Sequence, residues 1–372
     1  GYATLVSMNE VILELEKPQV KDGVPELGEL AIASQHESLI GFRKRLLGID
    51  TSTWTVPQQV DYLLVWSKMN DLFFQHRVMQ PWSRDPLSYL YQFRRIPYAE
   101  VPSVTADEEA LAVELRAVPV MVDNAIKNLA QPAGELAKLA IFLLDHFDGV
   151  GQGEPYRDTP PEGTIGWFED LCARLDAAGS DLLGECAAAT AAAQRYHDWL
   201  AENLDGMQAT AAIGTDNYNW YLRHVRLLPQ TVDDLKSIGL REFHRYRFNY
   251  MLDRYRNRSL PELELTQSTE QHEQRTRDAE SRTRALVEEL DLFTIPDYMP
   301  DEFETDVFWS PRAKTDRHFW EELQFRNALN NHIHASIPGH RFDAEIRKRL
   351  DNPIRRTHSE SARAEGWATY LE

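Results

Sequence analysis

The chain has 372 residues and a formal net charge of −19 at pH 7. Its composition, 42% hydrophobic and 27% charged, is ordinary for a globular protein. The negative charge argues against nucleic acid and anionic membrane as partners, because both would repel it. The sequence has no apolar run long enough to span a membrane, and no basic segment followed by an apolar one at its start. These features predict a cytoplasmic protein that binds neither nucleic acid nor membrane.

The two cysteines, Cys172 and Cys186, add to this expectation. Two cysteines are too few for a disulfide scaffold. We therefore expect both thiols to be unpaired and buried as small apolar groups, as they would be in a reducing cytosol.

Helical periodicity dominates the sequence, beginning clearly at Pro57. This proline suits the first turn of a helix that continues to Phe73, and Thr55 is a plausible cap. The pattern places Val60, Leu63, Leu64 and Leu72 on one repeating face. We expect this face to be the buried one.

The other predicted helices follow the same reasoning of caps, acidic first turns and apolar spacing. One of them begins at residue 106, with Thr105 as its cap. The others cover residues 132–147, 167–204, 231–255 and 268–290, and the second of these four has a break at Gly179. Residues 306–309 are the best strand candidate, and residues 152–163 form a loop rich in proline and glycine. The sequence therefore predicts an all-α protein, with minimal β structure, that forms one large domain over residues 1–372.

Two charged stretches need an interpretation. Glu273 and Arg277 are four residues apart in the helix predicted over 268–290, which suits a surface ion pair. The stretch Phe243–Phe248 alternates aromatic and basic residues, as nucleic-acid-binding segments do. Because the whole chain is strongly negative, we interpret this stretch instead as a helix that buries its aromatic face and solvates its arginines.

The residues that indicate chemistry lie in the segment 330–372. His332, His334 and His340 occur within nine residues, and imidazole nitrogens together with a carboxylate are common zinc ligands. Six residues of continuous helix turn through about 600°, which would misalign His334 and His340. The intervening pair Pro338-Gly339 must therefore break the helix, and such a break could bring both rings to one ion. His332 is expected to point elsewhere, as a supporting or surface group.

This segment resembles the signature of the bacterial family known as domain of unknown function 885, whose members are gluzincin-like metallopeptidases. Members typically read His-Glu-x-x-Pro-Gly-His, followed some twenty-odd residues later by Glu-Gly-Trp-Ala-x-Tyr-x-Glu. Here the two motifs are the segments His334–His340 and Glu365–Glu372, and the second matches at every fixed position. The segments Arg84–Tyr89, Ile213–Tyr218 and Thr231–Gly239 also resemble family landmarks, so the similarity spans most of the chain.

The resemblance implies a zinc site held by His334 and His340, with Glu365 as the third ligand. It also implies that Tyr370 and Glu372 lie near the catalytic centre, one of them as a substrate or oxyanion contact. The implied substrate is a peptide or a small molecule with an amide bond. Arg341 and Trp367 are candidate substrate-binding residues, although burial tendencies favour Trp367 and Tyr370 as core aromatics.

The sequence departs from the family signature at Ala335, where members carry the glutamate that acts as general base. A methyl group accepts no proton, and losing a general base removes a factor of about 10²–10⁴ from a rate. Three hypotheses follow. In the first, the chain is an inactivated hydrolase, or a hydrolase in which Glu360 or Glu372 is the base. In the second, it is a pseudoenzyme that serves as a binding or regulatory subunit. In the third, it is a metal-dependent lyase or hydrolase that acts on a specialised metabolite.

The resemblance also concerns the length of the chain. Family members continue for well over a hundred residues beyond the Glu-Gly-Trp motif, whereas this sequence ends at Glu372. We expect either a truncated molecule or a second chain that supplies the remaining part.

Overall fold

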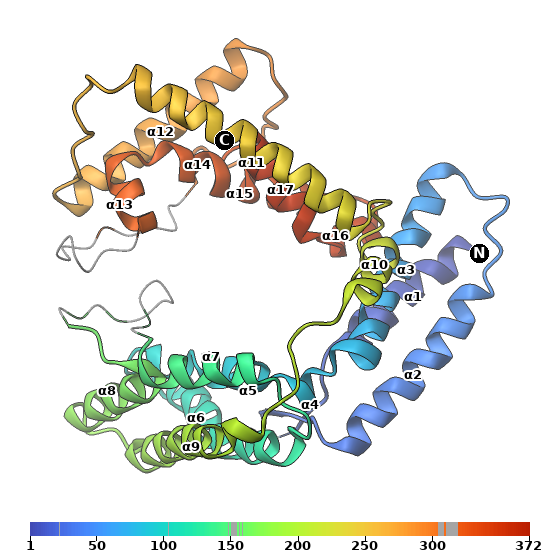
Figure 1. Ribbon diagram of the computed structural model, residues 1–372, viewed down its shortest axis with the longest axis vertical. Helices are drawn as coiled ribbons and strands as arrows, with labels where there is room; N and C mark the ends of the chain where they lie inside the picture. The colour runs from blue at the N-terminus through green and yellow to red at the C-terminus, as the bar shows by residue number, and fades with distance from the viewer. Residues whose placement is uncertain are drawn as a thin grey trace. The chain divides into compact units, whose positions relative to one another are not determined.

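The computed structural model describes residues 1–21, 23–102, 104–147, 149, 155, 157, 159–303, 309 and 319–372 (Figure 1). Helices make up 70% of the structure and strands 2%, which confirms the all-α prediction. The chain divides into two compact units, Gly1–Val232 and Asp233–Glu372, whereas we expected one domain. Among the described residues, each helix is too short or too polar to cross a lipid bilayer.

The described part of the first unit is mainly helical and contains a small hairpin, in which β1 and β2 pair antiparallel. Short π and 3-10 segments occur at Gln75–Met79, Ile96–Tyr98 and Leu204–Gly206. Its elements are α1 Tyr2–Glu16, β1 Val20–Lys21, β2 Val24–Pro25, α2 Glu29–Leu47, α3 Val56–Phe74, α4 Pro81–Arg84, α5 Pro86–Phe93, α6 Thr105–Asn128, α7 Gly134–Asp145, α8 Gly163–Ala177, α9 Leu183–Asn203 and α10 Thr215–His224.

Helix α3 begins as the sequence predicts but buries a face that only partly matches the predicted one. Thr55 forms a capping box with Gln58, whose side chain accepts a hydrogen bond from the Thr55 amide. However, Val60 and Leu63 are exposed, and the buried side chains include Val65 and Met69. The predicted face was wrong at Val60 and Leu63 and right at Leu72, which is buried, because α3 packs against α1, α2 and α10, and these neighbours determine which side chains are covered.

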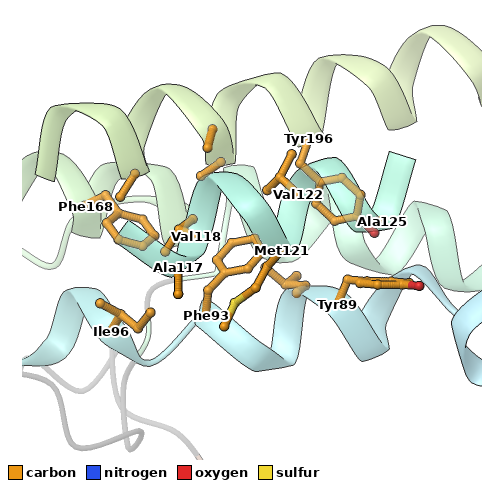
Figure 2. Close-up of a cluster of buried hydrophobic side chains, with 14 of the residues drawn as sticks. Tyr89, Phe93, Ile96, Ala117, Val118, Met121, Val122, Ala125, Phe168 and Tyr196 are labelled. Atoms are coloured by element: carbon orange, nitrogen blue, oxygen red, sulfur yellow. The ribbon is translucent and has the colours of Figure 1, made fainter. Parts of the chain in front are cut away.

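The main core of the first unit lies between α5, α6, α8 and α9. Figure 2 shows Phe93 of α5 beside Met121 of α6, with Phe168 of α8 and Tyr196 of α9 on the other side. The rings of Phe93 and Tyr196 meet edge to face, with centroids 6.4 Å apart. The Tyr196 hydroxyl donates to the backbone carbonyl of Pro86 at 2.8 Å, so this buried polar group is satisfied.

The two cysteines lie in this core and are paired. Cys172 of α8 and Cys186 of α9 form a disulfide across the helical hairpin, with their Cα atoms 5.6 Å apart. The expectation of two unpaired thiols was wrong. The turn at Gly179, which has a positive φ of 67°, folds α9 back along α8 and brings the two side chains together.

The second unit contains the two long helices predicted over 231–255 and 268–290, and several short ones. Ser268 caps α12, its hydroxyl accepting from the amide of Gln271, and the predicted surface pair of Glu273 and Arg277 is present at 3.7 Å. Of the predicted strand, only Trp309 belongs to the described residues. The elements are α11 Val232–Arg256, α12 Thr269–Glu289, α13 Phe319–Arg326, α14 Leu329–Ala335, α15 His340–Lys348, α16 Pro353–Thr357 and α17 Ser361–Leu371.

Helix α11 does not bury an aromatic face. All of its residues are described and none is buried; the exposed fractions of Phe243, Tyr246 and Phe248 are 56%, 58% and 66%. The interpretation that one face packs its aromatic side chains inside was therefore wrong. Apolar and charged residues alternate all round this helix, so no single stripe is available for packing.

A small apolar cluster supports the short C-terminal helices. Met299, Ile337 and Phe342 are buried together, and Phe293 packs against them. The Phe293 ring lies 5.6 Å from that of Phe342 in α15 and 6.3 Å from that of Trp367 in α17, measured between centroids. This cluster fixes the turn between α14 and α15 relative to α17.

Candidate metal centre

The segment that links α14 to α15 breaks the helix, as the pair Pro338-Gly339 predicts. Helix α14 ends at Ala335 and α15 begins at His340. The two helices approach so closely that a Cβ atom at Gly339 would overlap the backbone oxygen of His334. Only glycine fits at this position. The break brings together two histidines that a continuous helix would separate.

Three side chains converge at this turn. The imidazole rings of His334 and His340 are 4.7 Å apart between centroids and nearly perpendicular. Each ring faces a different oxygen of Glu365: His334 Nε2 is 3.4 Å from Oε2, and His340 Nε2 is 3.5 Å from Oε1. One ligand atom from each of the three residues lies within 4.8 Å of the other two.

These separations suit a single zinc ion. Two ligands about 2.1 Å from zinc and at a tetrahedral angle are about 3.4 Å apart. The two distances from the histidine nitrogens to Glu365 are close to this value, each to a different carboxylate oxygen, and one ligand atom from each residue lies within 4.8 Å of the others. The Glu365 side chain is 62% exposed and the histidine side chains 26% and 33%, so the trio lies at the surface with one side open. Two histidines and one glutamate with an open position are the ligand set of catalytic zinc sites.

Glu372 orients the first histidine. The Nδ1–H group of His334 donates to Glu372 Oε1 at 2.6 Å. This bond fixes the tautomer in which Nε2 carries the lone pair, and it leaves Nε2 directed toward Glu365. A carboxylate behind a histidine is the usual support of a zinc ligand. Glu372 therefore occupies a supporting position in this structure, and its carboxylate is engaged with the ligand ring.

Two further contacts hold α17 against the turn. The indole Nε1–H of Trp367 donates to the backbone carbonyl of Pro338 at 2.8 Å. Arg363 pairs with Asp343 of α15 at 2.5 Å. Both contacts join the helix that carries Glu365 to the segment that carries the histidines. Trp367 is half-buried and thus positions the ligand helix, in addition to any contact with substrate.

The remaining predicted site residues surround the trio in different ways. Tyr370 is 84% exposed, so it is not a core aromatic. Arg341 is the second residue of α15 and is partly exposed, and Ala335 is the last residue of α14. Glu360 caps α17, its carboxylate accepting from the amide of Arg363 at 2.6 Å. Of the two alternative bases, Glu360 is engaged in this cap and Glu372 in the bond to His334.

Sequence reasoning missed a buried pair on the opposite side of α14. His332 Nε2 lies 2.7 Å from Glu280 Oε2, and both side chains are only 3% exposed. Burial alone would raise the pKa of Glu280, but hydrogen bonds from His332, Arg284 and the Phe303 amide outweigh it, so the pKa is lowered. No local pattern marks Glu280, because it lies within a helix rich in charged residues.

Comparisons with known proteins identify the fold alone. The chain matches no family model and no curated protein. A solved structure from Shewanella oneidensis, described as a "putative lipoprotein of unknown function", is similar, with a TM-score of 0.66 and 15% sequence identity. The similarity covers 100% of the present chain and 76% of that one. At this identity the comparison supports a shared all-α fold and carries no information on function.

Proposed function

We propose that this protein is a zinc-binding protein of the metallopeptidase type related to the domain of unknown function 885, with a site that acts on peptide or amide bonds. The observation that carries the proposal is the convergence of His334, His340 and Glu365 at separations that suit one zinc ion. The hydrogen bond from His334 to Glu372 supports the proposal further, because it leaves the lone pair of His334 on Nε2, where it can bind a metal.

In this proposal the side chains have distinct tasks. A zinc ion held by the trio would supply Lewis-acid polarisation of a substrate carbonyl. Glu372 would keep His334 in the coordinating tautomer, and Trp367 would hold α17 in place. Tyr370 and Arg341 are the candidates for substrate contact, since Tyr370 projects into solvent and Arg341 could bind a carboxylate.

Zinc binding is the decisive measurement. Isothermal titration of the metal-free protein with Zn²⁺ should give one site per chain. His334→Ala should lower the affinity at least 100-fold, because a three-residue site loses one of its ligands. His244→Ala, in α11 and away from the trio in sequence, is the control and should bind zinc like the wild type. Full stoichiometry at unchanged affinity in His334→Ala would refute the ligand assignment.

Hydrolysis is expected to be weak because Ala335 occupies the base position. Restoring the base with Ala335→Glu should raise the peptidase rate by about 10²–10⁴, the usual contribution of a general base. Ala335→Gln, which matches the size but cannot accept a proton, is the control. The rates are compared on a mixture of fluorogenic peptides with zinc bound. Equal rates for Ala335→Glu and Ala335→Gln would contradict a base role for this position.

A pseudoenzyme is the second candidate, and Ala335 together with the engagement of Glu360 and Glu372 favours it. In this case the metal would stabilise a binding or regulatory surface without turnover. A protein that binds zinc but stays inactive on all substrates until Ala335→Glu is introduced would support this candidate over an enzyme with a different base.

A further inference from the structure

Glu280 is a buried carboxylate with an unusual number of donors. It lies in the middle of α12, is 3% exposed, and accepts hydrogen bonds from three directions. His332 donates at 2.7 Å, the Arg284 guanidinium at 2.5 Å, and the backbone amide of Phe303 at 3.1 Å. Arg284 also donates to the carbonyl of Pro300. Glu280 thus joins α12, α14 and the segment around Phe303 at one point.

His332 and His334 face opposite sides of α14. Residues two apart on a helix are separated by about 200°, so the two rings cannot face the same neighbour. His332 points to α12, where it is buried against Glu280, while His334 points to α15 and α17. Helix α14 therefore bonds Glu280 on one face and presents the metal ligand on the other.

The orientation of helix α14 depends on contacts such as this one, because the helix is too short to be stable alone. It has seven residues and no side-chain cap at its start. A helix this short is unstable alone and is held by its tertiary contacts. The tip of a side chain lies roughly 6 Å from the helix axis. A rotation of the helix by about 20° about this axis would therefore displace the tip by about 2 Å. Zinc ligands tolerate displacements of only about 0.2 Å.

We propose that Glu280 is a positioning residue of the metal centre, which acts through His332 to fix the rotation of α14 and thereby the place of His334. This inference rests on the proposed zinc site. It assigns a role in metal affinity to a carboxylate that touches none of the three ligands. If the pair instead only stabilises the fold, its removal would leave the zinc affinity of the folded protein unchanged.

The test is a set of zinc titrations at 10 °C, with thermal unfolding recorded for each variant. Glu280→Gln should bind zinc 10- to 100-fold more weakly, the usual effect of losing a residue that supports a ligand. The absorption spectrum of bound Co²⁺ should change as well, because the ligand geometry changes. Asp170→Asn is the control. Asp170, like Glu280, is a carboxylate with several hydrogen-bond donors, in its case two arginines, but it lies in the first unit.

Two changes at His332 separate positioning from general damage. His332→Gln retains an N–H donor toward Glu280 and should keep zinc affinity within about threefold of the wild type. His332→Phe fills the space without a donor and should behave like Glu280→Gln. In His332→Phe, Glu280 keeps its hydrogen bonds from Arg284 and the Phe303 amide. This variant therefore tests the proposal even if Glu280→Gln does not fold.

The outcomes are distinct. Weaker zinc binding by folded His332→Phe, and by Glu280→Gln where it folds, with normal binding by His332→Gln and Asp170→Asn, would establish the positioning role. Wild-type affinity and an unchanged Co²⁺ spectrum in folded His332→Phe would overturn it and leave the zinc site intact. A wild-type protein that binds no zinc would overturn the proposed function, and this inference with it.

Discussion

Single residues would decide whether the proposed metal centre can form. Gly339 allows α14 and α15 to approach each other, and the short distance from its position to the His334 carbonyl leaves no room for a side chain. Ala335 has the opposite effect, because it leaves the ligand set in place and removes the group that would take a proton. In the proposed site, metal binding and turnover would depend on different positions of the segment His334–His340.

Gly339→Ala should therefore disrupt the centre. The added methyl group must push α14 away from α15, which we expect to cost about 3 kcal/mol of unfolding free energy and at least tenfold in zinc affinity. Denaturant unfolding and zinc titration measure the two effects.

Gly366→Ala is the matched control for this change. It lies beside Glu365 in α17, and a Cβ atom there would meet no atom within 4 Å. Alanine should stabilise this helix by up to about 1 kcal/mol, since glycine is a poor helix former. If both variants bound zinc equally well, close packing at Gly339 would not be what assembles the site.

The sequence predicts some residues of the centre better than others. Pro338-Gly339 could be recognised because this pair breaks a helix whatever surrounds it. The partnership of His332 with Glu280 could not, because the two are 52 positions apart and meet only when α12 and α14 pack. The role of Glu372 toward His334 depends likewise on how α17 returns to the turn.

At the scale of elements, long helices follow from local signals and short ones do not. The bounds of α3 and α12 agree with the predicted ones because capping residues and apolar spacing act locally. Helices α14, α15 and α16 have nine residues or fewer, so packing rather than intrinsic propensity stabilises them. Packing also explains why the buried face of α3 was partly misassigned, since three neighbouring helices cover it.

At the scale of the whole molecule, the disulfide bears on where the protein works. A cytoplasmic location was predicted in part from the two cysteines, which the structure pairs within the core of the first unit. Stable disulfides form in oxidising compartments and are rare in the cytosol. The pairing thus removes one of the arguments for a cytoplasmic location.

Thiol titration tests this pairing. Protein purified without reductant and unfolded in denaturant should show no reactive thiol, and two after reduction. Because the disulfide joins residues 14 positions apart in the sequence, the double variant Cys172→Ala/Cys186→Ala should lose about 3 kcal/mol of unfolding free energy. Two thiols in the unfolded, unreduced protein would contradict the pairing and restore the argument for a reducing compartment.

The way the ligands are distributed along the chain has a mechanical consequence. His334 and His340 lie on either side of one tight turn, whereas Glu365 belongs to α17 and Glu372 directly follows it. A bound ion would thus cross-link the turn between α14 and α15 to α17. The Trp367 bond to Pro338 already joins α17 to the turn, so the ion would add a second connection between the same two segments.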